Sequence, residues 1–247
     1  MIDYDGFNYE KFKELACNDT ISVYQKIGFP DSYRNKCEKF IWQDIKDKCP
    51  ILKTKHGIKV LNIGPGCSNL QKMISDWCQK MDDVQILADS PEMLELLPEH
   101  PKEIKVPGLF PETYEEIKEI TNGVDVIICY SVFQYIFVDS NVWFFLDCVL
   151  DLLNEGGQCI LGDIPNIDKR KRFFASPSGV SFHQKFMHTK EIPNIKFNCL
   201  ERGVIDESML FALIHKCHSS GYDAYILPQD SRLPFANRRD DIIIRRL

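Results

Sequence analysis

Three residues in the first half of the chain have the types and spacing of a nucleoside-binding site. The apolar run VLNI (60–63) ends in Gly64-Pro65-Gly66, and a polar segment that begins a helix follows it. In an open parallel sheet, a glycine turn at this point lets backbone N–H groups approach a ligand. Asp89 ends the next apolar run, where a carboxylate can accept hydrogen bonds from both hydroxyls of a ribose. Gly64, Gly66 and Asp89 together favour a bound nucleoside.

Each of these features also has a simpler explanation. A tight strand-to-helix turn needs glycine for its positive φ angle whether or not a ligand binds, and a carboxylate at a strand end often caps the next helix. The combination favours the nucleoside, but it does not favour a dinucleotide. The G-x-G-x-x-G fingerprint would have its third glycine where this chain has Asn69. An NAD-dependent oxidoreductase is therefore the weaker alternative.

The elements that must position these residues alternate between strand and helix. Apolar runs of strand length lie at 58–63, 84–88, 103–106, 124–130 and 158–163, and helical segments lie at 69–80, 91–97, 112–120 and 141–153. This alternation is typical of a parallel sheet covered by helices. A helix at 207–219 precedes two strands, 222–227 and 240–247, with no helix between them, which predicts an antiparallel pair. We expect an α/β fold with a mostly parallel, seven-stranded sheet.

Length and composition limit the domain organisation. The chain of 247 residues has no Pro/Ser/Gly-rich linker, so we expect one domain over residues 1–247. Residues 1–55 precede the first strand and are typical of a helical cap over an edge or the mouth of the sheet. Residues 164–205 form a connection far longer than usual, and such an excess generally has a function. We expect this insertion to line a substrate site.

Charge and cysteine content argue against several classes of protein. The formal net charge of −6 gives no general electrostatic footprint for nucleic acid. No apolar run approaches the ~20 residues that span a bilayer, and the N-terminal segment is not signal-like, so we expect a cytoplasmic protein. The ten cysteines are scattered without a C-x-x-C pair, which predicts mainly reduced core thiols and no metal site.

Four segments, in the right order and spacing, resemble motifs of the class I S-adenosylmethionine-dependent methyltransferases. They are VLNIGPGCSNL (60–70), LADSPEML (87–94), VDVIICYSVFQYI (124–136) and LNEGGQCILGD (153–163). The expected antiparallel terminal strand also matches that family. The resemblance implies a Rossmann-like methyltransferase fold with helices on both faces of the sheet, and S-adenosyl-L-methionine as the cofactor.

The resemblance also implies which positions hold this cofactor. Gly64 and Gly66 would run beneath its methionine and ribose portions, with Asp89 on the ribose hydroxyls. The full set of implied positions is Asn62, Gly64, Pro65, Gly66, Asp89, Ser90, Met93, Tyr130, Ser131 and Gln134. Leu109 and Phe110 occupy the place of the family's adenine contacts, although the usual Gly-Asp dipeptide is absent there.

Methyl transfer to a hydroxyl needs an aligned acceptor and a base. Asp163, at the end of the fifth strand, and His183, in the insertion, are the candidate bases. The basic run 169–172 suggests an electropositive rim that selects phosphate or carboxylate, although a solvated loop explains such a run equally well. The predicted acceptor-binding residues are Asn166, Lys169, Arg170, Arg172 and Arg238.

The segment GDIPNIDKRKRF (162–173) more loosely resembles methyltransferases of bacterial surface-polysaccharide gene clusters, for O-antigen or capsule. We therefore predict O-directed methyl transfer to a small, polar, anionic metabolite of cell-surface carbohydrate synthesis: a sugar, a nucleotide sugar or a phosphoramidate. A member of the fold that binds the cofactor without catalysis, or an adapter that binds nothing, is the alternative from a different class.

Overall fold

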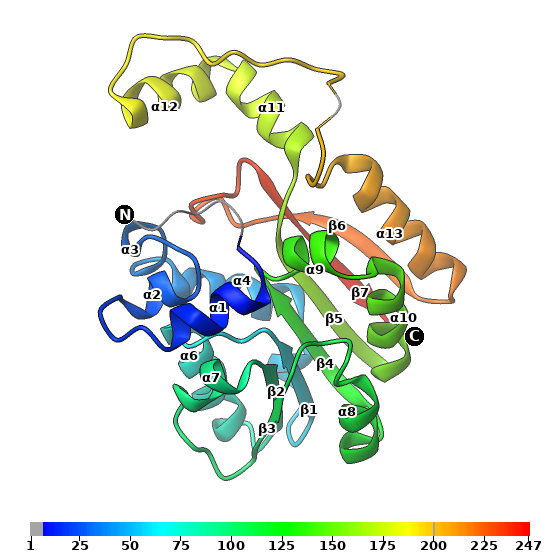
Figure 1. Ribbon diagram of the computed structural model, residues 1–247. Coiled ribbons are helices and arrows are strands. Elements are labelled where there is room, and N and C mark those ends of the chain that lie inside the picture. The colour runs from blue at the N-terminus through cyan, green and yellow to red at the C-terminus, as the bar shows by residue number, and fades with distance from the viewer. Residues whose placement is uncertain (1–6, 200) are drawn as a thin grey trace.

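The computed structural model describes residues 7–199 and 201–247 and is built around one seven-stranded sheet (Figure 1). Its strands are β1 (Lys59–Ile63), β2 (Val84–Asp89), β3 (Glu103–Pro107), β4 (Val124–Tyr130), β5 (Leu153–Pro165), β6 (Asp223–Pro228) and β7 (Arg239–Arg245). They lie in the order β3-β2-β1-β4-β5-β7-β6. Strands β1 to β5 are parallel, whereas β7 is antiparallel to both β5 and β6. The predicted fold class and the antiparallel C-terminal pair are confirmed.

Helices connect the strands and cover both faces of the sheet. They are α1 (Tyr9–Ala16), α2 (Val23–Lys26), α3 (Asp31–Arg34), α4 (Glu38–Lys48), α5 (Ile51–Thr54), α6 (Asn69–Lys80), α7 (Pro91–Glu95), α8 (Tyr114–Thr121), α9 (Phe133–Asp139), α10 (Val142–Leu152), α11 (Ile167–Ala175), α12 (Pro177–Met187) and α13 (Glu207–Ser219). The bounds of α6 and α13 are those that the sequence predicted. Helices α9, α11 and α12 were not predicted from the sequence.

The central strands are buried on both faces because helices cover each side. In β4, Val126 and Ile128 face one hydrophobic cluster and Ile127 and Cys129 face the other, and none of the four is exposed. This is the two-residue period of a strand. Helices α4, α5 and α6 supply one cluster, and α8, α9, α10 and α13 supply the other. Continuous apolar runs are what a parallel sheet buried on both faces requires.

The segment before β1 is helical, and α1, α2 and α3 lie together beside the sheet (Figure 1). Asn8 begins α1 by accepting a hydrogen bond from the Lys11 N–H, and Ser22 begins α2 with a reciprocal capping box to Gln25. Residues 1–6 of the predicted cap lie outside the described residues. The assignment of 1–247 to one domain stays an interpretation of the sequence.

The insertion contains two helices that stand off the body of the molecule (Figure 1). We call α11 and α12 (167–187) the arm. The Asn166 carboxamide caps α11 by accepting from the N–H groups of Asp168 and Lys169, at 3.0 and 3.1 Å. Ser176 caps α12, with Pro177 in its first turn. Residue 200 of the insertion is outside the described part of the chain.

Most of the cysteines are core residues. All ten lie in the described ranges and none is in a disulfide, and Cys49, Cys78, Cys129, Cys148, Cys159 and Cys217 are buried. Burial raises the pKa of the Cys49 thiol to about 12, so this thiol is neutral at physiological pH. Within the same ranges, none of the helices combines the length and apolar character that crossing a membrane requires.

Candidate functional site

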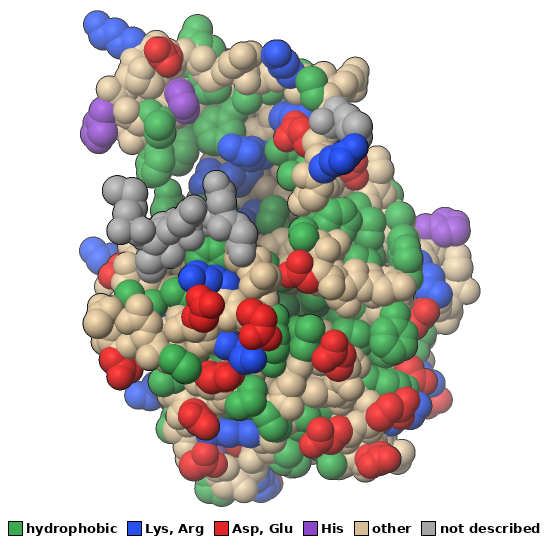
Figure 2. Space-filling model, viewed as in Figure 1, with side chains coloured by type: hydrophobic (Ala, Val, Ile, Leu, Met, Phe, Trp, Pro, Cys, Tyr) green, Lys and Arg blue, Asp and Glu red, His purple; other side chains and the backbone are tan. Residues whose placement is uncertain are grey.

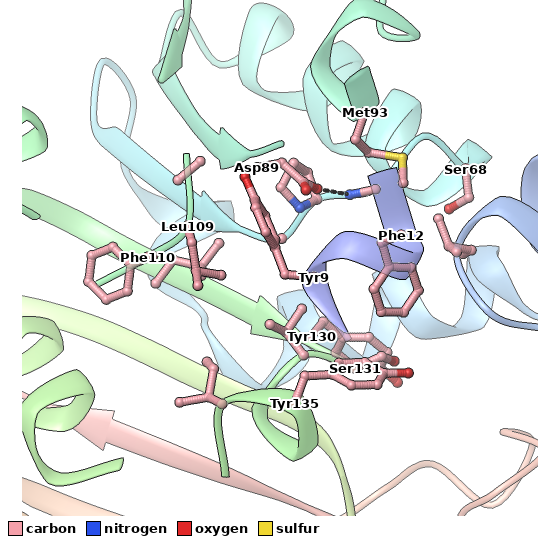
Figure 3. Close-up of a pocket in the computed structure, with 18 of the residues that line it drawn as sticks. Tyr9, Phe12, Ser68, Asp89, Met93, Leu109, Phe110, Tyr130, Ser131 and Tyr135 are labelled. Carbon is pink, nitrogen blue, oxygen red and sulfur yellow. Dashed lines mark hydrogen bonds between the residues drawn. The ribbon is translucent and has the colours of Figure 1, made fainter. Parts of the chain in front are cut away.

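A pocket opens at the carboxyl ends of β1, β2 and β4 (Figure 3). It encloses about 1040 Å³ of empty space, its open mouth included. Strand order reverses between β1 and β4, and the crevice at such a reversal is where open α/β sheets bind ligands. Its floor comes from the loop after β1, and the remaining walls come from β2, the loop after β3, the end of β4, α9 and the N-terminal helices.

The loop after β1 needs both of its glycines. Gly64 and Gly66 have φ angles of 64° and 61°, which only glycine adopts readily. A Cβ atom on Gly64 would lie 2.6 Å from a methyl of Val132, and one on Gly66 would lie 2.6 Å from a methyl of Ile27. The absence of side chains at Gly64 and Gly66 also leaves the pocket floor open. The two glycines therefore allow both the backbone conformation of the turn and the approach of a ligand.

Asp89 ties this loop to the end of β2. Its carboxylate accepts a hydrogen bond from the backbone N–H of Gly66, at 3.0 Å (Figure 3). It accepts a second from the backbone N–H of Ser90, at 2.7 Å. Ser90, not Asp89, caps α7, because the Ser90 hydroxyl accepts from the Met93 N–H. The helix-cap explanation of Asp89 therefore fails. Burial raises the pKa of the Asp89 carboxyl to about 6, and the two N–H donors partly offset that rise.

Aromatic side chains that were not assigned to a site from the sequence form one wall of the pocket. Tyr9 and Phe12 come from α1, and Tyr135 comes from α9 (Figure 3). The Phe12 and Tyr135 rings meet edge to face, with their centroids 5.0 Å apart. None of the three was predicted as a site residue, although Tyr135 lies within the motif at 124–136. Their only signal is the apolar face of two short helices, which does not distinguish a pocket wall from a core.

Most of the predicted cofactor positions line the pocket. Those that do are Gly64, Pro65, Gly66, Asp89, Met93, Tyr130 and Ser131, together with Leu109 and Phe110. Three others lie just behind the lining. Asn62 is buried and donates to Gln71, Ser90 caps α7, and the Gln134 carboxamide donates to the Ser131 carbonyl at 2.7 Å. These three support the pocket wall without facing the empty space.

Asp163 does not have the surroundings of a base. It is 4% exposed, and it is not among the residues that line the pocket. One carboxylate oxygen accepts from the Ser131 hydroxyl and from Arg239, and the other accepts from Gln229 at 3.1 Å. Arg34 lies 3.8 Å from the same carboxylate. Because these donors occupy both oxygens, Asp163 is placed to hold its neighbours rather than to take a proton.

His183, the other predicted base, lies on α12 against the ring of Phe174, with the centroids 6.3 Å apart. It does not line the pocket. The structure therefore does not bring Asp163 and His183 together.

The basic run is helical and mostly ion-paired. Lys169 pairs with Asp240 at 2.6 Å, Lys171 with Glu201, and Arg172 with Glu207. Asn166 is buried and donates to Asp240 besides capping α11. These contacts hold the arm together and attach it to the body. Arg170 and Arg238 are different: within residues 7–199 and 201–247, neither forms an ion pair.

Arg34 is a site residue that no sequence motif indicated. Of the described residues that line the pocket, it is the only cation. Its guanidinium donates to the Ser131 hydroxyl at 2.6 Å and lies over the Phe29 ring, 4.1 Å from the centroid. It belongs to the N-terminal segment, where a single arginine on a one-turn helix gives no recognisable pattern.

Comparisons of the whole fold find methyltransferases. The plantazolicin methyltransferase BpumL, solved in complex with SAH, has a TM-score of 0.59 and 12% identity over 97% of this chain and 95% of that one. The methyltransferase domain of the bacterial CtHen1 has a TM-score of 0.53 and 14% identity over 84% of this chain and all of that one. A chain of the Haloferax volcanii complex of the Trm112 methyltransferase activator with a putative methyltransferase has a TM-score of 0.52 and 12% identity over 95% and 96%.

No protein-family model and no curated protein matches the sequence. At these identities the structural likeness establishes the fold, which is the Rossmann-like methyltransferase fold.

Proposed function

We propose that this protein is an S-adenosyl-L-methionine-dependent methyltransferase. The observation that carries the proposal is the pocket at the strand reversal, where a glycine floor and the Asp89 carboxylate face the same space. The likeness to methyltransferases solved with SAH supports it.

The residues present fit this cofactor. Asp89 would accept hydrogen bonds from the ribose hydroxyls, and Gly64 and Gly66 would leave room beneath the methionine portion. Arg34 adjoins Ser131 at the end of β4, on the other side of β1 from Asp89, and suits the methionine carboxylate. When bound, the cofactor supplies an activated methyl group for displacement by a nucleophile of the acceptor. The protein's own part is to align that nucleophile and exclude water.

The acceptor that we propose is a small, polar, anionic metabolite, methylated on oxygen. Arg170 and Arg238 support the anionic character, because they are the cations of the predicted set that no described carboxylate neutralises. The narrower link to cell-surface carbohydrate synthesis rests on the sequence resemblance of residues 162–173 alone. A cytoplasmic location is likewise a prediction from sequence.

Calorimetry with two ligands tests the cofactor. We expect S-adenosylhomocysteine to bind with a dissociation constant in the micromolar range or below, about −8 kcal/mol or better. NAD should give no measurable heat. Tight binding of NAD without S-adenosylhomocysteine would instead support the oxidoreductase, and binding of neither ligand would support the adapter.

A further inference from the structure

An unbroken series of ring and guanidinium contacts leads from the pocket to the arm. Phe29 lines the pocket, and its ring centroid is 6.2 Å from that of Phe235. Arg238 lies over the Phe235 ring, 4.6 Å from the centroid. The same guanidinium lies 5.7 Å from the centroid of Phe182, on α12. The side chains at the start of β7 and on the arm therefore pack in one series with the wall of the pocket.

The charge in this space is positive. Burial lowers the pKa of Arg238, and the neighbouring cations Arg239 and Arg170 lower it further. Asp163 forms an ion pair with Arg239 and also raises the pKa of Arg238, but neither Arg170 nor Arg238 forms an ion pair with any of the described residues. Arg238 is partly buried and Arg170 is exposed beside it, and neighbouring cations that repel one another favour an anion between them. Figure 2 shows Lys and Arg side chains set back in a hollow between the arm and the body.

The arm side of this hollow is aromatic. Phe182 packs against Phe174 with centroids 6.2 Å apart, and it stacks on Phe186 at 5.9 Å with the planes 6° apart. Arg170 lies over the Phe174 ring at 5.8 Å. Phe186 is 57% exposed. Large apolar side chains that are grouped on a surface generally mark a binding site. A flat, conjugated ring system is the ligand that such a surface accepts best.

We infer that the cleft between α12 and the start of β7 binds the acceptor by a nucleoside phosphate group. Its phosphate contacts the guanidinium groups of Arg238 and Arg170, and its base stacks on Phe182. The rest of the acceptor passes Phe235 and Phe29 and enters the pocket beside Ser131. This assignment rests on the proposed methyltransferase function. It deepens that proposal, because a nucleotide supplies both the anion and the planar ring that the cleft suits.

Titration with UDP, uridine and pyrophosphate tests the inference. S-adenosylhomocysteine is present at saturation, so that the first pocket is filled and cannot take the probe. We expect UDP to bind at least tenfold more tightly than uridine, which lacks the phosphates, and than pyrophosphate, which lacks the base. Equal binding of UDP and pyrophosphate would overturn the role of the ring. Equal binding of UDP and uridine would overturn the role of the cations.

Matched variants locate the site. Arg238→Ala and Arg170→Ala should each weaken UDP by about 10- to 100-fold, the loss expected for one charge-assisted contact, and Phe182→Leu by a smaller factor. Arg232→Ala is the control, because Arg232 also lies over an aromatic ring but pairs with Asp230. UDP binding that survives all three site variants, or that Arg232→Ala reduces equally, would overturn the inference.

Two outcomes separate this inference from the proposed function. If the parent protein fails to bind S-adenosylhomocysteine but binds UDP with the predicted variant pattern, the methyltransferase proposal fails and the nucleotide cleft stands. If it binds S-adenosylhomocysteine but not UDP, the cleft assignment fails alone. The variants leave the glycine loop intact, so each should bind S-adenosylhomocysteine as tightly as the parent does. An unchanged affinity shows that the variant is folded.

Discussion

At the scale of single residues, the edge of the pocket depends on hydrogen bonds between the Asp89 carboxylate and two backbone N–H groups. Asp89 accepts from Gly66 and Ser90, and these bonds fix its position at the pocket edge. The sequence predicted Asp89 and the glycine loop because their conformation and chemistry restrict the residue types allowed. Arg34 was missed because its partner, Ser131, is distant in sequence and becomes a neighbour only in the fold.

The pH dependence of cofactor binding should report the Asp89 carboxyl, whose pKa burial raises to about 6. Ribose hydroxyls donate to the ionised form, so binding lowers this pKa, and affinity is complete above pH 6 and lost as the pH falls through it. We expect the dissociation constant of S-adenosylhomocysteine to rise up to about tenfold per pH unit below 6. Calorimetry between pH 5 and 8 measures it.

Asp89→Asn is the control, because asparagine has no charge to lose. Its affinity for S-adenosylhomocysteine should be weaker than that of the parent and should change little between pH 5 and 8. The raised pKa of Asp89 affects the stability of the unliganded protein in the opposite direction. Its free energy of unfolding increases as the pH falls below 6, because the folded state binds a proton on Asp89 more tightly than the unfolded state does. A parent dissociation constant that is flat from pH 5 to 8 would remove Asp89 from the site.

At the scale of elements, the sequence predicted the regular alternation and missed the irregular parts. Strand periodicity and helix boundaries such as those of α6 follow from local residue types. Helix α9 directly follows β4, and its apolar sequence FQYIFVD continues the strand pattern without a break. The arm is held by pairs such as Lys169–Asp240 and Arg172–Glu207, which join positions far apart in sequence. Three residues of the basic run, Lys169, Lys171 and Arg172, are therefore held in ion pairs, and Arg170 is the residue of the run that stays available to an anion.

Helix α1 closes one side of the pocket, and its Phe12 ring contacts Tyr135 on α9. Phe12→Ala should remove an aromatic pair worth about 0.5–1.5 kcal/mol. We expect the dissociation rate of S-adenosylhomocysteine to rise about 2- to 10-fold, with a smaller change in the association rate. Stopped-flow fluorescence measures both rates. Phe211→Ala, at an exposed phenylalanine of α13, should leave them unchanged, and an equal effect in both variants would mean that α1 does not retain the ligand.

At the scale of the whole molecule, one buried network joins three separate parts of the chain. Asp163 on β5 meets Arg239 on β7 and Arg34 on α3, and its own N–H donates to Asp241, which pairs with Lys48 on α4. The N-terminal helices, the parallel sheet and the C-terminal hairpin are therefore held together directly behind the pocket. No local pattern could predict this network, because each pair has a wide separation in sequence.

Asp163→Asn distinguishes the network from the catalytic role that the sequence suggested. Asparagine tolerates the φ angle of 60° at this position, so the main change is the lost charge, which leaves Arg34 and Arg239 without compensation. Breaking a buried pair in this way costs about 3–5 kcal/mol, and we expect that loss in the free energy of unfolding measured by urea denaturation. Adding Arg239→Met should recover part of it, since one of the uncompensated cations is then gone. A base with no such structural role would give the opposite result: Asp163→Asn would unfold at the same urea concentration as the parent and lose only methyl transfer.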